Sequence, residues 1–436
     1  MRKSVHEFLW VALPKASGAA FQLGLNLILL RYFGPEQFGL VAVCLSIIIL
    51  SDAVLGSAFD VAILRQAPLY QLNDPVRSLQ IQQAGLIMKP VLGVLIAVPL
   101  VVFGSRMSAL LFHGRGTTSL LYITAAAVFS LLLLRSVQAH FQVGRKFRGY
   151  GALDIGHNTV RYGGTALLLW MHVATPLRVV ALYALGPGLI ALVLLATIAK
   201  PLITVPVSLL AVRQIFDLIK SYLPTAAVGS ITTRIDLFFV SSLLGVGQAG
   251  VFAAAQTLIL APQLVGMYMG VVFAPRIMPL FQAGELRAVY NRFQKYTMVV
   301  CCGTYLAGLA MTTKLIAVAL PASFQNATPV AIILLPVGLA AVVNFPWTVS
   351  FLMFMRPQFL LKFDLVGLPI LAVLYSLVVP AYGLPGAAYV TTGYALIKTI
   401  ALQKVAQDIL SQAKLPTGPS NLDGASSELQ LAGKAS

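Results

Sequence analysis

The chain has 436 residues, of which 58% are hydrophobic and only 10% are charged, and its mean hydropathy is +0.88. Soluble globular domains carry about 25% charged residues, so this composition excludes a soluble class. Lys and Arg outnumber Asp and Glu by 30 to 13, which gives a formal net charge of +17. No basic cluster is interleaved with aromatic residues on a polar domain, so no nucleic-acid partner is expected.

Apolar stretches of roughly 20 residues recur along the whole chain, which is the length needed to cross the ~30 Å hydrocarbon core. Backbone N–H and C=O groups need internal partners in lipid, so these stretches predict helices. The expected fold class is an all-α integral membrane protein with about twelve transmembrane helices. The predicted spans are 8–30, 38–62, 84–104, 117–139, 156–174, 178–199, 222–244, 249–273, 296–318, 327–353, 359–380 and 384–404.

The spans divide into two sets of six. Residues 200–221 are amphipathic and too interrupted to span, which predicts a cytoplasmic connector between an N-terminal lobe (1–199) and a C-terminal lobe (222–405). The segment 406–436 is rich in Ser, Gly and Ala and predicts a disordered cytoplasmic tail.

The placement of Lys and Arg predicts the orientation of the chain in the membrane. With the N-terminus inside, most loop cations fall on the cytoplasmic side, and the outer loops hold only Arg31, Arg106, Arg115 and Arg178. Both termini are therefore expected in the cytoplasm. The first apolar stretch contains Pro14 and Lys15 and has no convincing cleavage site, so it does not read as a cleaved signal peptide.

One internal repeat is visible at the predicted outer turns. The stretch 30–43 (LRYFGPEQFGLVAV) is similar to the stretch 242–255 (SLLGVGQAGVFAAA) when residues are matched at a constant offset of 211. The matched pairs are Gly34 with Gly245, Gln37 with Gln248, and Gly39 with Gly250. The repeat predicts two parallel six-helix units related by an axis along the membrane normal. The alternative is chance similarity between two tight turns that both need glycine.

The sequence offers no metal, cofactor or nucleotide site. Cys44, Cys301 and Cys302 lie in apolar segments, where small buried hydrophobes are expected. No spacing among the cysteines and the five histidines suggests metal ligands. No phosphate-binding loop of the P-loop type is present, so direct ATP drive is not expected.

Four segments carry a resemblance to a known family. They are RYFGPEQFGLVAVCLSIIIL (31–50), RIDLFFVSSLLGVGQAGVFAAAQTL (234–258), APRIMPLFQAGELRAVYNRFQKY (274–296) and YGLPGAAYVTTGY (382–394). They resemble the corresponding segments of Wzx-type oligosaccharide flippases and related polysaccharide exporters. The resemblance implies the multidrug/oligosaccharidyl-lipid/polysaccharide exporter superfamily, with two six-helix lobes around a central cavity worked by alternating access.

The same resemblance implies the activity. Proteins of this kind are not enzymes, and they flip an undecaprenyl-pyrophosphate-linked oligosaccharide from the cytoplasmic to the outer face of a bacterial inner membrane. The product feeds O-antigen, capsule or exopolysaccharide synthesis. Expected partners are this lipid-linked oligosaccharide, membrane lipids, and a polysaccharide polymerase with its chain-length proteins.

Ionisable residues within spans are costly in lipid and are therefore candidates for function. The predicted cationic cavity consists of Lys15, Lys89, Arg161, Arg234 and Lys398, with Gln22 and Asn26 extending the polar face of Lys15. Such a cavity would attract a pyrophosphate, which Arg and Lys bind well. The alternative for Lys15, Lys89 and Arg161 is that they reach to the headgroups, as Lys314 is expected to do on the outer side.

Three acidic residues also lie within predicted spans. Asp52 and Asp236 are candidates for ion coupling, because a buried carboxylate can exchange protons with a gradient. The alternatives are a salt bridge from Asp52 to a cavity cation and a structural role for Asp236. Asp60 is expected to have a structural role near Arg65. Arg234 and Asp236 are two residues apart on one helix, so they are not expected to pair.

Three other functions stay open. A multidrug or cation antiporter of the same superfamily would need an acidic cavity. A lipid II flippase is expected to carry an extra helix pair, for which the chain has no room. A membrane-bound glycosyltransferase or polymerase would need sizeable catalytic loops, and the longest outer connection, about 105–116, offers only Arg106, His113 and Arg115.

Overall fold

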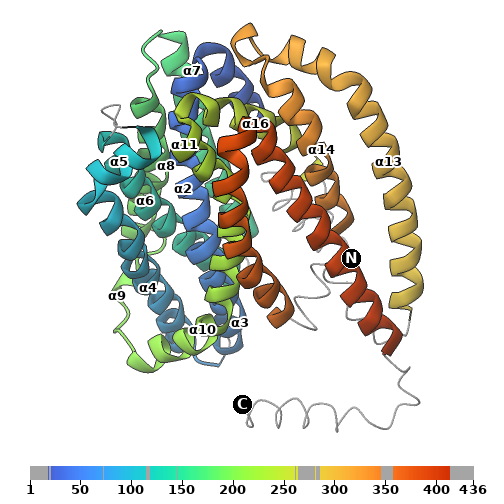
Figure 1. The fold of residues 1–436 in the computed structure, drawn as a ribbon. Helices are drawn as coiled ribbons and strands as arrows, with labels where there is room; N and C mark the ends of the chain where they lie inside the picture. Colours follow the sequence, from blue (N-terminus) through green and yellow to red (C-terminus); the bar gives the residue numbers. More distant parts are fainter. Residues whose placement is uncertain are drawn as a thin grey trace.

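The structure is a computed structural model that describes residues 18, 21–71, 73–113, 118–144, 146–260, 262–263, 280, 285–344 and 357–412. Within these ranges the regular elements are helices, and no β-strand occurs. Figure 1 shows α13 and α14 along one edge of the molecule, with α4, α5 and α6 along the opposite edge.

We refer to the helices up to α8 as the N lobe. Its first helix is described over 21–32. The remaining elements are α2 (Pro35–Ser51), the π-helical turn η1 (Asp52–Gly56), α3 (Ser57–Tyr70), α4 (Pro75–Val102), α5 (Gly104–Phe112), α6 (Thr118–Val143), α7 (Phe147–Trp170) and α8 (Pro176–Ala196). α6 packs against α2, α4 and α8, so it forms the centre of the lobe.

We refer to the helices from α11 onward as the C lobe. Between the lobes lie α9 (Pro201–Thr204) and α10 (Leu209–Thr232). The C lobe contains α11 (Ile235–Leu244), the helix Val246–Leu260, α13 (Leu286–Ala319), η2 (Ala322–Phe324), α14 (Ala327–Asn344) and α16 (Pro357–Gln412).

Six helices of the described chain are long and apolar enough to cross a membrane, and a seventh span results if the bent pair α10–α11 counts as one. Each predicted span overlaps a helix over its described residues, and α16 contains two of the predicted spans, 359–380 and 384–404. The two arms of α16 fold back on each other at Gly383, which has φ 62° and ψ −145°. A positive φ of this kind suits glycine.

Two helices begin before the spans predicted within them. α4 begins at Pro75 and α7 begins at Phe147, whereas the predicted spans begin at 84 and 156. Lys89 and Arg161 therefore each lie about 20 Å along their helix from its first residue, at ~1.5 Å of rise per residue.

The predicted connector, 200–221, is docked on the N lobe. An apolar face of α10 formed by Ala211, Ile215 and Ile219 belongs to the same core cluster as residues of α3, α4 and α6. Arg77 of α4 donates to Ser208 Oγ at 3.0 Å and to Gln214 Oε1 at 2.9 Å. The second half of α10 forms the first part of the seventh span, so one helix, Leu209–Thr232, joins the connector to that span.

The C-terminal helix is longer than predicted. α16 extends to Gln412, seven residues into the segment expected to be a disordered tail, because Leu402, Ala406 and Leu410 are buried. The rest of that segment lies outside the described residues.

The two copies of the repeat meet at the ends of the lobes that the sequence predicts to be the outer ones. A Cβ on Gly39 would lie 2.0 Å from the carbonyl oxygen of Val246, and a Cβ on Gly250 would lie 1.9 Å from that of Pro35. These contacts are reciprocal, because the repeat matches Gly39 with Gly250 and Pro35 with Val246. The backbones of the two copies are in contact at the position where a symmetry axis relating the two lobes would pass. The repeat thus has a structural basis, and glycine is required for this approach.

We expect Gly39→Ala to lower the melting temperature of the purified protein, because its methyl group would collide with the backbone of Val246. Overpacking of this kind costs about 1–3 kcal/mol. Gly34→Ala is the matched control, since an added Cβ there meets nothing within 4 Å. Equal melting temperatures for the two variants would contradict the backbone contact.

Candidate functional site

The N lobe carries a bidentate ion pair between α6 and the turn η1. Arg135 donates from Nε to Asp52 Oδ1 at 2.8 Å and from Nη2 to Asp52 Oδ2 at 2.6 Å. The pair continues through Gln138, which accepts from Arg135 at 3.0 Å and donates to Asp154 at 3.3 Å. Bidentate contacts fix geometry as well as charge. The ion-coupling candidate Asp52 is therefore held by a cation that was not among the sequence candidates.

The π-helical turn provides the space for this pair. Asp52 begins η1 and Gly56 ends it. A Cβ on Gly56 would lie 2.5 Å from Asp52 Oδ1, so only glycine leaves room for the carboxylate in this position. π-helical turns within helices are frequent at functional positions.

Lys89 is fully buried and paired. Its exposed fraction is 0%, and its Nζ lies 2.5 Å from Asp60 Oδ1. A buried ammonium in contact with a carboxylate cannot also reach the headgroups, so that alternative is wrong for Lys89. The pairing gives Asp60 the structural role that the sequence predicted, but with Lys89 as its partner.

Arg161 has no carboxylate partner among the described residues. Its guanidinium lies 3.9 Å from the ring centroid of Tyr183 on α8, and Nη1 lies 3.4 Å from Asn158 Oδ1. A cation over an aromatic face is attracted to it, and the attraction is stronger away from water. Arg161 Nε and the Tyr183 hydroxyl are both buried without a hydrogen-bond partner in the part of the chain that the structure describes. The arrangement leaves a half-buried positive charge inside the N lobe.

The polar face of the first helix lies next to this arginine. Tyr162 donates its hydroxyl to Gln22 Oε1 at 2.9 Å, and Gln22 Nε2 donates to Asn26 Oδ1 at 3.2 Å. The ring of Tyr162 also lies 5.4 Å from the guanidinium of Arg161. The structure thus brings the predicted residues Gln22, Asn26 and Arg161 into one group. Lys15 lies outside the described residues.

Arg234 and Asp236 lie at a break in the seventh span. α10 ends at Thr232, α11 begins at Ile235, and their axes differ by 44°. Arg234 is half-buried, and the structure gives it no hydrogen bond or ion pair with the described residues. Asp236 is 3% exposed and accepts hydrogen bonds from the amide of Leu237 at 2.7 Å and from Gln256 Nε2 at 2.7 Å. As predicted, the two charges do not pair.

Lys398 is neutralised by a residue that the sequence analysis missed. Its Nζ lies 2.6 Å and 2.9 Å from the two carboxylate oxygens of Asp364, on the other arm of α16. Tyr394 donates to the same carboxylate at 2.6 Å, and Asp364 is 4% exposed. The signal was present, since Asp364 lies within the predicted span 359–380. The predicted excess of cations over acids was therefore too large.

The predicted cavity cations now fall into two groups. Among those that the structure describes, Lys89 and Lys398 have carboxylate partners, whereas Arg161 and Arg234 do not. No group of three or more His, Cys, Asp or Glu side chains suited to a metal ion occurs in the described part of the chain. The arrangement is suited to binding an anion by arginine.

Residues 4–281 match the family of polysaccharide biosynthesis proteins. The match covers more than half of the sequence, including the ion pairs of the N lobe, Arg161 and the broken span with Arg234. The chain belongs to this family. A sequence comparison with curated proteins gave no match.

The fold of this polysaccharide biosynthesis protein is similar to solved transporter structures. Lipid II flippase MurJ in an inward closed conformation aligns with a TM-score of 0.72 and 14% identity, covering 92% of this chain and 87% of that chain. An inward-facing multidrug resistance MATE family transporter of the MOP superfamily aligns with a TM-score of 0.64 and 10% identity, covering 94% of this chain and 100% of that chain. A MOP superfamily transporter from Pyrococcus furiosus aligns with a TM-score of 0.62 and 12% identity, covering 93% of this chain and 95% of that chain. These likenesses establish a multi-pass transporter fold with two six-helix lobes around a central cavity.

The bidentate pair between Asp52 and Arg135 leads to a prediction about the melting temperature of the protein. Asp52→Asn would leave Arg135 charged and unpaired, and breaking a buried pair costs about 3–5 kcal/mol. The Arg135 side chain is 30% exposed, so we expect a loss near the lower end and a melting temperature several degrees below wild type.

Asp217→Asn is the control, because the Asp217–Lys220 pair is exposed and such pairs contribute little. Adding Arg135→Gln to Asp52→Asn should recover part of the loss. If the Asp52→Asn and Asp217→Asn variants have the same melting temperature, the Asp52–Arg135 pair does not stabilise the lobe.

Proposed function

We propose that the protein flips an undecaprenyl-pyrophosphate-linked oligosaccharide from the cytoplasmic to the outer face of a bacterial inner membrane. The observation that carries the proposal is the unpaired Arg234 at the break of the seventh span. The family of polysaccharide biosynthesis proteins and the transporter fold support it. The protein itself would catalyse no covalent step.

Arg234 is suited to the pyrophosphate. A guanidinium donates several hydrogen bonds in a fixed geometry that matches phosphate oxygens. An arginine without a carboxylate partner in a low-dielectric site gains more from an anionic ligand than one that is already paired. Transporters commonly bind substrates at discontinuous helices, and α10–α11 is such a helix. Lys89 and Lys398, whose charges are paired, would instead hold the lobes together.

The group of Gln22, Asn26 and Arg161 would provide a second contact with the substrate from the N lobe. Carboxamides and an arginine can donate to sugar hydroxyls or to the second phosphate. The sequence predicts that Lys15, which lies outside the described residues, would join this contact from the same face of the first helix. The acyl chain would remain in the bilayer between the lobes.

The rocking units would be the predicted lobes, 1–199 and 222–405. The connector, 200–221, would move with the N lobe, because α10 is docked on it through Arg77 and a shared apolar cluster. The lobes touch at their outer ends, so the substrate would enter from the cytoplasmic side. Both termini would lie in the cytoplasm.

Asp236 is the better of the two ion-coupling candidates. Asp52 has a bidentate arginine, whereas the hydrogen-bond donors to Asp236 are the neutral groups of Leu237, Gln256 and Thr391. A carboxylate with neutral donors can gain and lose a proton without breaking an ion pair. Proton binding there would remove a negative charge beside Arg234 and strengthen binding of the anionic substrate, and loss of that proton would favour its release. A polymerase and chain-length proteins would receive the product.

Deletion of the gene in its native host, followed by complementation, tests the proposal. We expect loss of surface polysaccharide and accumulation of lipid-linked repeat units on the cytoplasmic face. Arg234→Gln should fail to restore the polymer, because it removes the charge that holds the pyrophosphate. Lys220→Gln, which changes an exposed cation of the connector, should restore it fully.

Two results would contradict the proposal. Unchanged polysaccharide with increased sensitivity to cationic drugs would point to the multidrug antiporter. Loss of cell-wall precursor export instead of surface polysaccharide would point to a lipid II flippase.

A further inference from the structure

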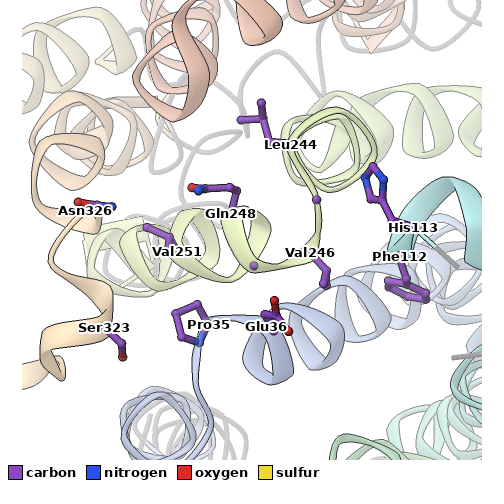
Figure 2. A pocket seen from close by; sticks show the side chains of 12 residues that line it. Pro35, Glu36, Phe112, His113, Leu244, Val246, Gln248, Val251, Ser323 and Asn326 are labelled. Carbon is purple, nitrogen blue, oxygen red and sulfur yellow. The ribbon is translucent and has the colours of Figure 1, made fainter. Parts of the chain in front are cut away.

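A cavity of about 410 Å³ lies between the outer ends of the two lobes. Its N-lobe wall includes Pro35, Glu36, Phe112 and His113, and its C-lobe wall includes Leu244 to Gln248 with Ser323 and Asn326. Figure 2 shows Glu36 at the start of α2 on one side and the carboxamides of Gln248 and Asn326 pointing toward each other. The volume falls within the ~300–1,000 Å³ range of small-molecule sites. This outer cavity is separate from the group at Arg234.

The lining of the outer cavity indicates an uncharged polar ligand. It offers a carboxylate, an imidazole, two carboxamides and a hydroxyl, from Glu36, His113, Gln248, Asn326 and Ser323. Neither Lys nor Arg is among the lining residues that the structure describes, so this part of the lining offers an anion no cationic partner. Sugar hydroxyls both donate and accept hydrogen bonds, which this mixture satisfies. The apolar side chains of Phe112, Val246 and Val251 can contact the C–H face of a sugar ring.

One of the differences between the two copies of the repeat leaves space for the cavity. Glu36 of the first copy is matched by Gly247 of the second. A Cβ on Gly247 would lie 3.3 Å from Glu36 Cγ, so a larger side chain at 247 would occupy the space next to the carboxylate.

Hydrogen bonds between the lobes hold the cavity together. Ser241 Oγ of α11 donates to the carbonyl of Leu111 on α5 at 2.5 Å, and His113 Nε2 donates to the carbonyl of Ser241 at 3.2 Å. His113 has φ 54°, a backbone conformation that residues other than glycine rarely adopt. Such strain persists only while the surroundings hold it in place. Separation of the lobes would therefore relax His113 and divide the cavity walls.

We propose that the outer cavity is a second carbohydrate site, which binds a neutral sugar from the outer side while the lobes are closed there. Its sugar would be a unit of the exported oligosaccharide, and this identity rests on the proposed function. Because both lobes contribute to it, an occupant stabilises the closed outer side and slows further export.

Protection from cysteine labelling tests the site. In full-length protein with Cys302→Ser, Asn326→Cys places a thiol in the cavity wall, and Gln325→Cys places one on the exposed neighbouring residue outside it. The label is a membrane-impermeant maleimide, and the probes are glucose, galactose and N-acetylglucosamine, with galacturonate as the anionic comparison. We expect at least one neutral sugar to slow labelling at 326 several-fold without affecting 325, and galacturonate to have a weaker effect.

Variants separate this site from the central one. Glu36→Gln, which keeps the shape, and Gly247→Leu, which fills the cavity, should both reduce protection, whereas Arg234→Gln should leave it unchanged. The inference is overturned if no neutral sugar protects 326, if both positions are protected equally, or if Arg234→Gln abolishes protection. Protection that persists although gene deletion leaves surface polysaccharide unchanged would support the outer site and reject the proposed function.

Discussion

A charge surrounded by hydrocarbon needs an opposite charge, a polar partner or water, and this constraint decides how the helices of each lobe meet. Asp52 and Arg135 join the turn η1 to α6, and Asp60 and Lys89 join α3 to α4. Lys398 and Asp364 join the two arms of α16. Each pair lies within one lobe. The charges therefore stiffen the lobes without fastening them to each other.

The contacts between the lobes at the glycine repeat are of a different kind. They include the backbone approach at Gly39 and Gly250, neutral hydrogen bonds between Ser241 and the end of α5, and apolar packing such as Phe38 against Phe324. Ser241 is buried, and a neutral group that loses its partner costs less free energy than a charged one. Separation of these named contacts would therefore break no ion pair.

α10 and α11 connect these two kinds of contact. The first half of α10 packs on α3 and α4 of the N lobe, and α10 and α11 both pack on α16 of the C lobe. Their axes differ by 44° at Arg234, so movement of one lobe relative to the other would act on this break. A ligand bound to Arg234 would feel that movement directly, which links binding to the position of the lobes.

Hydropathy and length are local properties, so the sequence by itself determined the all-helical membrane fold and the glycine repeat. It also showed that Arg234 and Arg161 lie within apolar stretches. Only the tertiary structure decided which cations are paired, because Lys89 meets Asp60 and Lys398 meets Asp364 through contacts between helices. The outer cavity was equally hidden, since its walls come from four turns far apart in the chain. Pairing depends on which helices become neighbours, and no local pattern contains that information.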